Sequence, residues 1–220
     1  MNAATNPAPT GPHADAPVLS TGTPLAEAQA AMILVHGRGA SARDILALTQ
    51  SWRADGIAYL APQAAGGTWY PQRFTAPLAQ NEPWLSSALA TLDALVARIG
   101  AAGIPPERTI LLGFSQGACL ASEYAARHAR RWGGVVALSG GLIGPDDAPR
   151  DYSGALDGTP VLLGCSDIDS HNPKERVIAS AAILERLGGA VTLRLYPGMG
   201  HEVNDDEITW VQALVGTVGR

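Results

Sequence analysis

A single turn in the middle of the chain carries the residue types of a nucleophilic site. Residues 113–117, GFSQG, separate an apolar, β-branched run at 109–112 from a helix-forming segment that begins at 118. A G-x-S-x-G turn between a buried strand and a helix is typical of a nucleophile elbow, whose strained backbone exposes the serine hydroxyl. Glycine suits both ends, because a Cβ there would collide with neighbouring backbone. We therefore predict that Ser115 is a nucleophile; the alternative is a glycine-rich turn with an incidental serine.

Activation of a serine hydroxyl needs a base, and the base needs a group that orients it. His201 ends the glycine-rich loop PGMGH, which follows a predicted strand at 191–196. Imidazole changes its charge near neutral pH and therefore suits proton transfer from a serine. The other histidines are predicted in an N-terminal tail, at a strand end, at a helix end and beside a candidate acid: His13, His36, His128 and His171. His201 is thus the predicted base.

Two aspartates compete for the role of the orienting acid. Asp167 and Asp169 both follow a predicted strand at 160–164, and the resulting order Ser, Asp, His is that of triads built on such an elbow. Asp169 lies just before Pro173, where a helix is expected to begin, because proline is favoured in the first helical turn. Asp167 is interpreted as a turn residue whose side chain accepts from nearby backbone N–H groups. We favour Asp169 as the acid.

Acyl transfer also needs N–H donors for the negative charge that develops on the carbonyl oxygen. One donor is expected from Gln116, the residue after the nucleophile, and a second from the loop HGRG at 36–39, for which we choose Arg38. The glycines of this loop allow the backbone to approach the substrate oxygen. The alternative is a plain turn at the end of the strand, which would leave the triad untouched.

A long loop at 62–82 is predicted to form one wall of the substrate site. Long loops in compact domains are usually functional or disordered, and the three aromatic residues in this one favour function. Together with two apolar residues from loops after later strands, these aromatic side chains are expected to wall an apolar pocket of limited depth. The predicted wall residues are Trp69, Tyr70, Phe74, Leu142 and Met199.

The elements that must position these residues alternate along the chain. A weak strand is expected within 17–23, and stronger ones at 30–36, 57–61, 109–113, 132–138, 160–164 and 191–196. Helices are expected at 41–53, 81–99, 118–128, 173–187 and 205–218. At least six alternations predict an α/β fold with a mostly parallel central sheet and helices on both faces. We expect one domain over 16–220 and a disordered tail at 1–15.

Composition argues against several classes of partner. The 220 residues carry a net charge of −5, which argues against nucleic acid or an anionic membrane surface as a partner. No apolar run could span a bilayer and the N-terminus lacks the features of a signal peptide, so a cytoplasmic protein is expected. Cys119 and Cys165 are interpreted as buried thiols. We see no metal-ligand cluster and no dinucleotide-binding glycine motif, so neither metal nor cofactor is predicted.

Four motifs together resemble one known family. VHGRGA at 35–40, GFSQGA at 113–118, D-x-H-x-P at 169–173 and PGMGH at 197–201 are similar to those of the phospholipase/carboxylesterase family of α/β-hydrolases, which includes the acyl-protein thioesterases. The resemblance covers roughly residues 16–218. It implies a single-domain α/β-hydrolase fold and a serine hydrolase that cleaves carboxylic esters or thioesters without a cofactor. It also implies Ser115 as nucleophile, Asp169 as acid and His201 as base, with an aromatic loop and short lid beside the site.

The chain departs from the family pattern in two places. The HG dipeptide that often precedes the acid loop is absent, because the sequence there is Leu163-Gly164-Cys165. The loop at 62–82 lacks an obvious apolar lid and instead carries the polar residues Gln63, Gln72, Arg73 and Gln80. The polar loop weakens the case for a long-chain lipid or an acylated protein as the substrate.

The predicted function is hydrolysis of small-molecule esters with short to medium acyl chains through an acyl-enzyme intermediate. No stable membrane insertion is expected, and a homodimer is left open. One alternative is a lysophospholipase or acyl-protein thioesterase that acts on long acyl chains. Another is a binding protein that keeps the hydrolase fold without its chemistry. Among enzymes, a peptidase or a dienelactone-type hydrolase is the runner-up, although the latter usually has a cysteine where this chain has Ser115.

Overall fold

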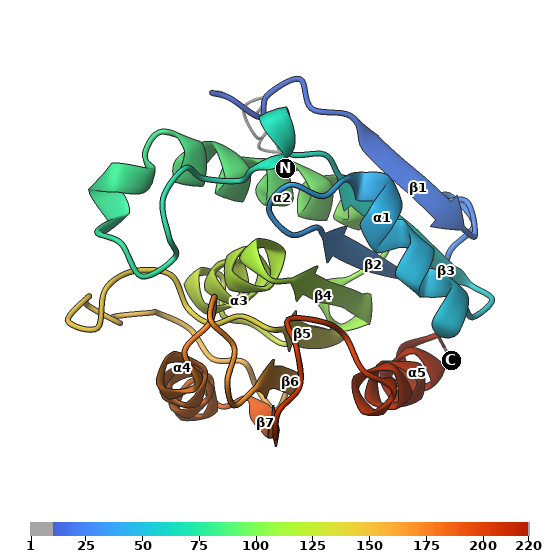
Figure 1. Cartoon of the computed structure of the whole chain (residues 1–220). Helices are drawn as coiled ribbons and strands as arrows, with labels where there is room; N and C mark the ends of the chain where they lie inside the picture. Colours follow the sequence, from blue (N-terminus) through green and yellow to red (C-terminus); the bar gives the residue numbers. More distant parts are fainter. Residues whose placement is uncertain (1–10, 220) are drawn as a thin grey trace.

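In the computed structural model, which describes residues 11–219, seven strands form one sheet in the order β1-β3-β2-β4-β5-β6-β7 (Figure 1). The edge strand β1 is antiparallel to β3, and all other neighbouring strands are parallel. The strands are β1 (Val18–Gly22), β2 (Ala30–Val35), β3 (Ile57–Pro62), β4 (Thr109–Phe114), β5 (Gly134–Leu138), β6 (Pro160–Ser166) and β7 (Ala190–Tyr196).

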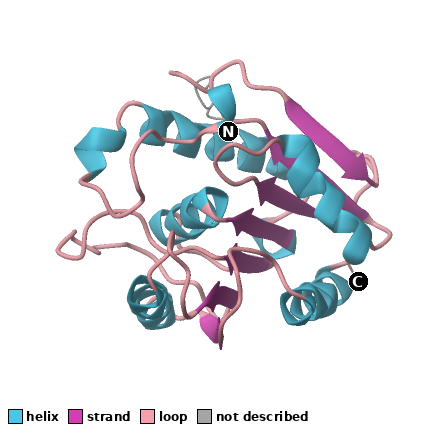
Figure 2. Ribbon diagram, in the orientation of Figure 1, coloured by secondary structure: helices cyan, strands magenta, loops and turns pink. Residues whose placement is uncertain are grey.

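Five α-helices of the described chain cover both faces of the sheet (Figure 2). One face is covered by α2 (Trp84–Ala101), α3 (Gln116–Arg127) and α4 (Lys174–Arg186), the other by α1 (Ala42–Ala47) and α5 (Asp205–Val218). Short 3₁₀ turns lie at Leu48–Ser51, Ala65–Gly67, Leu78–Asn81 and Pro106–Arg108. The predicted fold class, an α/β-hydrolase-type sheet with helices on both sides, is confirmed.

The continuous apolar sequence of β2 explains why both faces must be covered. All six of its residues are buried. Successive side chains of a strand point to opposite faces, so its odd-numbered residues join the core beneath α2, α3 and α4 and its even-numbered residues the core beneath α1 and α5. The strand therefore needs helices on both sides, as expected for a central parallel strand.

Two element boundaries differ from the sequence-based expectation. The helix expected over 41–53 ends at Ala47 and continues as the 3₁₀ turn Leu48–Ser51, while its predicted cap at Ser41 is present as a reciprocal capping box with Asp44. Strand β6 continues to Ser166, two residues past the predicted end. The longer strand places the two candidate acids at the edge of the sheet, because Asp167 is the first residue after the strand and Asp169 is the third.

The first described residues correct the expected disordered tail. His13 is buried, and its ring lies 5.3 Å from that of Trp69 and 5.4 Å from that of Trp84. Its Nε2 atom bonds the carbonyl oxygen of Trp69 at 3.0 Å, and burial lowers the pKa of the ring. Residues 11–15 therefore belong to the fold, because one ring between two indoles outweighs the polar composition around it. The expectation for residues 1–10 lies outside the described residues.

Both cysteines are free and buried, as predicted. Burial raises the pKa of each thiol, Cys119 and Cys165, to about 12. Within the part of the chain that the structure describes, no helix combines the length and apolar character needed to cross a bilayer. Over the same residues, no three His, Cys, Asp or Glu side chains are grouped as metal ligands would be.

Candidate active site

The turns that follow β4, β6 and β7 bring Ser115, Asp169 and His201 together. The Nε2 atom of His201 lies 2.8 Å from the hydroxyl oxygen of Ser115, and its Nδ1 atom lies 2.7 Å from Oδ2 of Asp169. Parallel strands end at the same edge of the sheet, which is why residues far apart in the sequence can meet there. The structure thus places the three predicted triad residues in one continuous chain of hydrogen bonds.

Ser115 occupies a strained backbone conformation at the start of α3. Its φ of 55° is rare for a residue with a side chain, and its N–H donates to the carbonyl oxygen of Leu138 at 2.8 Å. A Cβ at Gly113 would overlap the Gly117 carbonyl, and one at Gly117 would overlap the Val35 carbonyl. The tight approach of strand, turn and helix therefore demands glycine at both positions, and it directs the serine side chain outward.

Asp169 has both carboxylate oxygens bonded and its side chain fully buried. Oδ1 accepts from the backbone N–H groups of His171 at 2.7 Å and Asn172 at 3.1 Å, while Oδ2 faces His201. Burial alone would raise the pKa of Asp169, but the bonds from His201 and the two N–H groups outweigh it and lower the pKa. An ionised carboxylate only accepts, so the His201 proton lies on Nδ1 and Nε2 is left to accept from Ser115.

Asp167 has a different role from its neighbour. Its Oδ1 atom accepts from the N–H of Gly198 at 2.8 Å, and the hydroxyl of the preceding Ser166 donates to the carbonyl oxygen of Met199. As the sequence-based interpretation expected, the side chain of Asp167 accepts from a backbone N–H group; this group belongs to the loop that follows β7. These two bonds fasten the loop that carries His201 to the end of β6.

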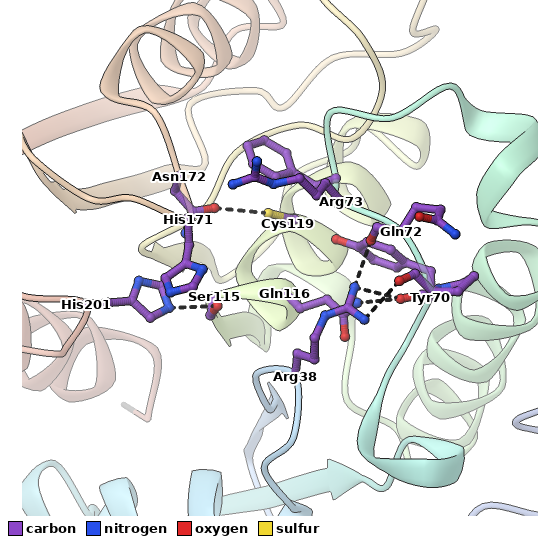
Figure 3. A pocket seen from close by; sticks show the side chains of 12 residues that line it. Arg38, Tyr70, Gln72, Arg73, Ser115, Gln116, Cys119, His171, Asn172 and His201 are labelled. Atoms are coloured by element: carbon purple, nitrogen blue, oxygen red, sulfur yellow. Dashed lines mark hydrogen bonds between the residues drawn. The ribbon is translucent and has the colours of Figure 1, made fainter.

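The two predicted oxyanion donors, Arg38 and Gln116, line the cavity beside Ser115 (Figure 3). Gln116 is the first residue of α3, so its N–H lacks a carbonyl partner one turn earlier in the helix. The positive end of the helix dipole lies at the same point and favours negative charge there. Among the described residues, no hydrogen bond occupies the N–H of Arg38.

The side chain of Arg38 clamps the loop at 62–82 beside the site. Its guanidinium donates to the carbonyl oxygens of Tyr70 at 2.9 Å, Pro71 at 3.0 Å and Gln72 at 2.7 Å. Three bonds to successive residues fix the course of the loop as it passes the cavity. Sequence reasoning assigned only the backbone of Arg38, because nothing in the pattern indicates where a long side chain will bond.

Gln116 and His36 also anchor the loop at 62–82. The Gln116 amide accepts from the N–H of Trp69 at 2.9 Å and donates to the Tyr70 carbonyl at 2.8 Å. His36 Nε2 accepts from the N–H of Ala64 at 3.0 Å, and Trp69 Nε1 donates to the His36 carbonyl at 2.8 Å. Burial lowers the pKa of His36, and a neutral ring suits the accepting role of Nε2. The loop is therefore anchored at several buried points.

A cavity of about 370 Å³ lies beside the triad. It is lined by Arg38, Tyr70, Pro71, Gln72, Arg73, Phe74, Ser115, Gln116, Cys119, His171, Asn172 and His201. Of the five predicted wall residues, Tyr70 and Phe74 contribute to this lining. Four further polar residues of the lining, Gln72, Arg73, His171 and Asn172, were not predicted as site residues, although the polar character of the loop at 62–82 was an available signal for the first two.

Three predicted wall residues do not line the cavity. Trp69 is fully buried, where its indole N–H bonds the carbonyl of His36. Leu142 is fully buried, with its carbonyl held by Arg176. The thioether of Met199 contacts the side-chain amide of Asn204, the residue that caps α5. Their apolar character was read correctly, but the direction of each side chain depends on tertiary contacts.

Comparisons with known proteins identify the family and the fold. The profile of the phospholipase/carboxylesterase family matches residues 18–218. The crystal structure of a phospholipase/carboxylesterase from Dyadobacter fermentans has a TM-score of 0.89 and 42% sequence identity, covering 96% of this chain and 100% of that one. The crystal structure of esterase PE8 has a TM-score of 0.77 and 27% identity, covering 92% of this chain and 99% of that one.

Relatives of known description share shorter stretches. Acyl-protein thioesterase 1 of Gibberella zeae is 34% identical over 122 residues, which are 51% of this chain and 49% of that protein. The chain spans about half the length of the curated relatives it matches. The solved structures match a larger part of the chain, 96% and 92% of its length.

Proposed function

We propose that this chain, which belongs to the phospholipase/carboxylesterase family, is a serine hydrolase that cleaves carboxylic esters of small molecules. The observation that carries the proposal is the chain of hydrogen bonds from Ser115 through His201 to Asp169, at the wall of an open cavity. A buried, ionised carboxylate that orients an imidazole toward a serine hydroxyl is the arrangement needed to make that hydroxyl a nucleophile.

In the proposed reaction, Nε2 of His201 accepts the hydroxyl proton as the Ser115 oxygen attacks the ester carbonyl carbon. The carbonyl π electrons move to its oxygen, which the N–H groups of Arg38 and Gln116 stabilise. When the tetrahedral intermediate collapses, the C–O bond to the alcohol breaks and His201 returns its proton to the departing oxygen. Water, deprotonated by His201, then attacks the acyl-enzyme and releases the acid and free Ser115.

The dimensions of the cavity support short to medium acyl chains. A volume of about 370 Å³ lies at the lower end of the range of small-molecule sites. Among the lining residues, Phe74 and Cys119 are buried and uncharged, whereas a polar rim is formed by the exposed residues Arg38, Gln72 and Arg73. A long acyl chain would have to leave the cavity past that rim. Rates with 4-nitrophenyl esters should therefore decline beyond medium chain lengths, and rates that climb up to the palmitoyl ester would favour the long-chain alternative.

Two buried thiols without a disulfide also support a cytosolic location, since reducing compartments keep cysteines free.

The hydrogen bond between Ser115 and His201 argues against the alternative of a binding protein without catalytic activity, because binding alone does not require it. Thioesters react through the same acyl-enzyme, so the proposal includes them as substrates of the same site.

Replacement of the nucleophile tests the proposal. Ser115→Ala should lower kcat for 4-nitrophenyl butyrate by about 10⁶-fold, the scale seen when a triad nucleophile is removed. Its melting temperature should stay close to that of the wild type, because alanine retains the Cβ in the turn. Ser86→Ala, at an exposed serine on α2, serves as the matched control and should keep full activity. Activity near that of the wild type in folded Ser115→Ala would refute the proposal.

A further inference from the structure

The cavity beside Ser115 carries a charge opposite in sign to that of the whole chain. The sequence has 20 acidic and 15 basic residues, giving a formal charge of −5. In contrast, the lining contains two arginines, Arg38 and Arg73, and no aspartate or glutamate. Asp169 is paired with His201 and does not contribute to the lining. A molecule entering the cavity therefore meets positive charge.

No carboxylate of the described residues neutralises this charge. Salt bridges within 4.0 Å engage four other arginines: Arg127, Arg150, Arg176 and Arg194. Neither Arg38 nor Arg73 has such a partner among residues 11–219; both donate to backbone carbonyls instead. A carbonyl satisfies an N–H group but leaves the positive charge of the guanidinium in place.

The two arginines differ in the number of donors that they keep available. Arg38 gives three hydrogen bonds to the loop at 62–82. Arg73 gives one, from Nη2 to the carbonyl oxygen of Ser170 at 3.2 Å, and it is exposed. Since a guanidinium has five N–H groups, Arg73 retains four. Figure 3 shows it at the side of the cavity formed by His171 and Asn172.

We infer that Arg73 makes the site selective for esters that carry a carboxylate, on the acyl or the alcohol part, within a few bonds of the scissile carbonyl. This inference rests on the proposed function. A guanidinium with adjacent free N–H groups fits a carboxylate in a two-point hydrogen-bonded pair. The positive charge of Arg38 adds attraction without a direct contact. The preferred substrates are thus monoesters of small dicarboxylic acids, or hydroxy acids whose hydroxyl group is acylated and whose carboxylate is free.

Matched substrate pairs isolate the carboxylate. Mono-4-nitrophenyl succinate and 4-nitrophenyl butyrate have acyl chains of equal length and differ in a terminal carboxylate or methyl group. In the same way, 3-carboxyphenyl butyrate and phenyl butyrate test the alcohol side. The quantity compared is the ratio of kcat/KM for the anionic ester to kcat/KM for its neutral partner. Electronic differences between the esters cancel when the same ratio is compared between two enzyme variants.

Arg73→Met, which removes the charge and the donors, should lower this ratio about ten- to hundredfold in at least one pair, as expected for loss of hydrogen bonds to a charged group. Arg73→Lys should retain part of the preference, because it keeps the charge without the planar fork. Arg98→Met, at the far end of α2 and outside the cavity, is the matched control and should leave the ratio unchanged. The preference should also weaken as salt concentration rises.

A purely structural role for Arg73 predicts a different result. If its bond to Ser170 only joins two loops, Arg73→Met will slow the anionic and the neutral esters alike, and both ratios will stay at the wild-type value. That outcome overturns the inference and leaves the proposed function standing. Failure of the wild-type protein to hydrolyse any of the four esters would instead refute the proposed function, and this inference with it.

Discussion

Two buried carboxylates of this molecule accept hydrogen bonds at both of their oxygens, yet they have different roles. Asp169 lies at the end of β6 and Glu123 in the middle of α3, and their side chains are 0% and 2% exposed. Each accepts hydrogen bonds from backbone N–H groups and from a cationic or ionisable side chain. Burial and hydrogen bonding alone therefore do not distinguish the candidate catalytic acid from a structural one.

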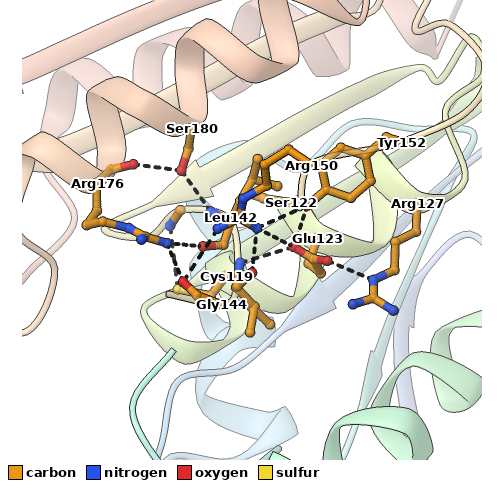
Figure 4. Close-up of polar contacts among 12 residues, drawn as sticks. Cys119, Ser122, Glu123, Arg127, Leu142, Gly144, Arg150, Tyr152, Arg176 and Ser180 are labelled. Carbon is orange, nitrogen blue, oxygen red and sulfur yellow. Dashed lines mark hydrogen bonds and ion pairs between the residues drawn. The ribbon is translucent and has the colours of Figure 1, made fainter. Parts of the chain in front are cut away.

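The network of Glu123 consists of partners that keep their protons (Figure 4). Arg127 Nε donates to one oxygen at 2.7 Å, while the Tyr152 hydroxyl and the Ile143 N–H donate to the other at 3.0 Å each. Arg150 lies 3.7 Å from the same carboxylate. Burial and Glu123 raise the pKa of Tyr152 to about 12. This network ties the loop after β5 to α3 and cannot transfer a proton near neutral pH.

The partner of Asp169 differs in that respect. An imidazole loses and gains a proton near neutral pH, whereas a guanidinium does not. The side chain of His201 is also 25% exposed and faces the cavity, so the effect of the carboxylate reaches a group that can meet substrate. The function of a buried carboxylate is therefore indicated by the side chain that it bonds, rather than by how deeply the carboxylate is buried.

Among the buried carboxylates, the largest effect on kcat is expected from changing Asp169. Asp169→Asn should lower kcat by about 10⁴-fold, because an amide lets His201 adopt the wrong tautomer. Protein yield and secondary structure should change little, since the amide oxygen can still accept from His171 and Asn172. Steady-state kinetics with 4-nitrophenyl butyrate measure the effect. A kcat within tenfold of wild type would show that this carboxylate does not act through His201.

Glu123→Gln is the matching change in the other network. It should lower the free energy of unfolding by about 3 kcal/mol, because Arg150 loses its anionic partner and an amide NH₂ group faces other donors. The kcat of the folded variant should remain within a factor of about three, since Glu123 does not line the cavity. Urea unfolding followed by tryptophan fluorescence gives the stability. A large loss of kcat with unchanged stability would show that Glu123 contributes to catalysis and is not a purely structural carboxylate.

A third buried carboxylate, Glu207 on α5, differs from these two because one of its oxygens has no hydrogen-bond partner. Burial raises its pKa from 4.5 to about 7. The folded protein therefore keeps a proton that the unfolded chain releases, so this contribution to stability is full below pH 4.5 and is lost as the pH rises to about 7.

Glu207→Gln removes this titration and can keep the cap, because its amide oxygen can replace Oε2 as the acceptor for the Asn204 N–H. It should be more stable than wild type at pH 8 by about 3 kcal/mol, with little difference at pH 4.5. Melting temperatures of both proteins between pH 4.5 and 8 test this. Parallel curves over the whole range would mean that Glu207 is ionised in the folded state.

A much smaller effect on kcat than that of Asp169→Asn is expected at the neighbouring Asp167. Asp167→Asn should keep kcat within about tenfold, because the amide oxygen can still accept from the N–H of Gly198 and Asp169 is left intact. Kinetics measured beside those of Asp169→Asn show the contrast directly. If the two variants behave in the opposite way, the assignment of the acid is wrong.

The sequence allowed the sheet, its helices and the three triad positions to be predicted, because strand ends and turn residues are local features. The glycines at 113 and 117, for example, signal the tight turn at Ser115 by themselves. Asp169 was separated from Asp167 by the helix start at Pro173, which is also local. These predictions depend on backbone geometry that neighbouring residues determine.

Side-chain direction and long-range anchoring were not predictable in the same way. His13 lies in a segment of polar composition, and its place between Trp69 and Trp84 depends on residues more than fifty positions away. Leu142 and Met199 follow strands as expected, but they do not line the cavity. Which face of a loop residue meets substrate is decided by tertiary packing, which no local pattern contains.

The central claim, that His201 and Asp169 activate Ser115 as a nucleophile, is tested most directly by covalent trapping. A fluorophosphonate reacts with an activated serine and stays attached, so peptide mass spectrometry can locate the adduct. We expect one phosphonyl group per chain, on the peptide that contains Ser115, and much slower labelling in Asp169→Asn. A folded wild-type protein that stays unlabelled, or that is labelled equally fast after Asp169→Asn, would contradict it.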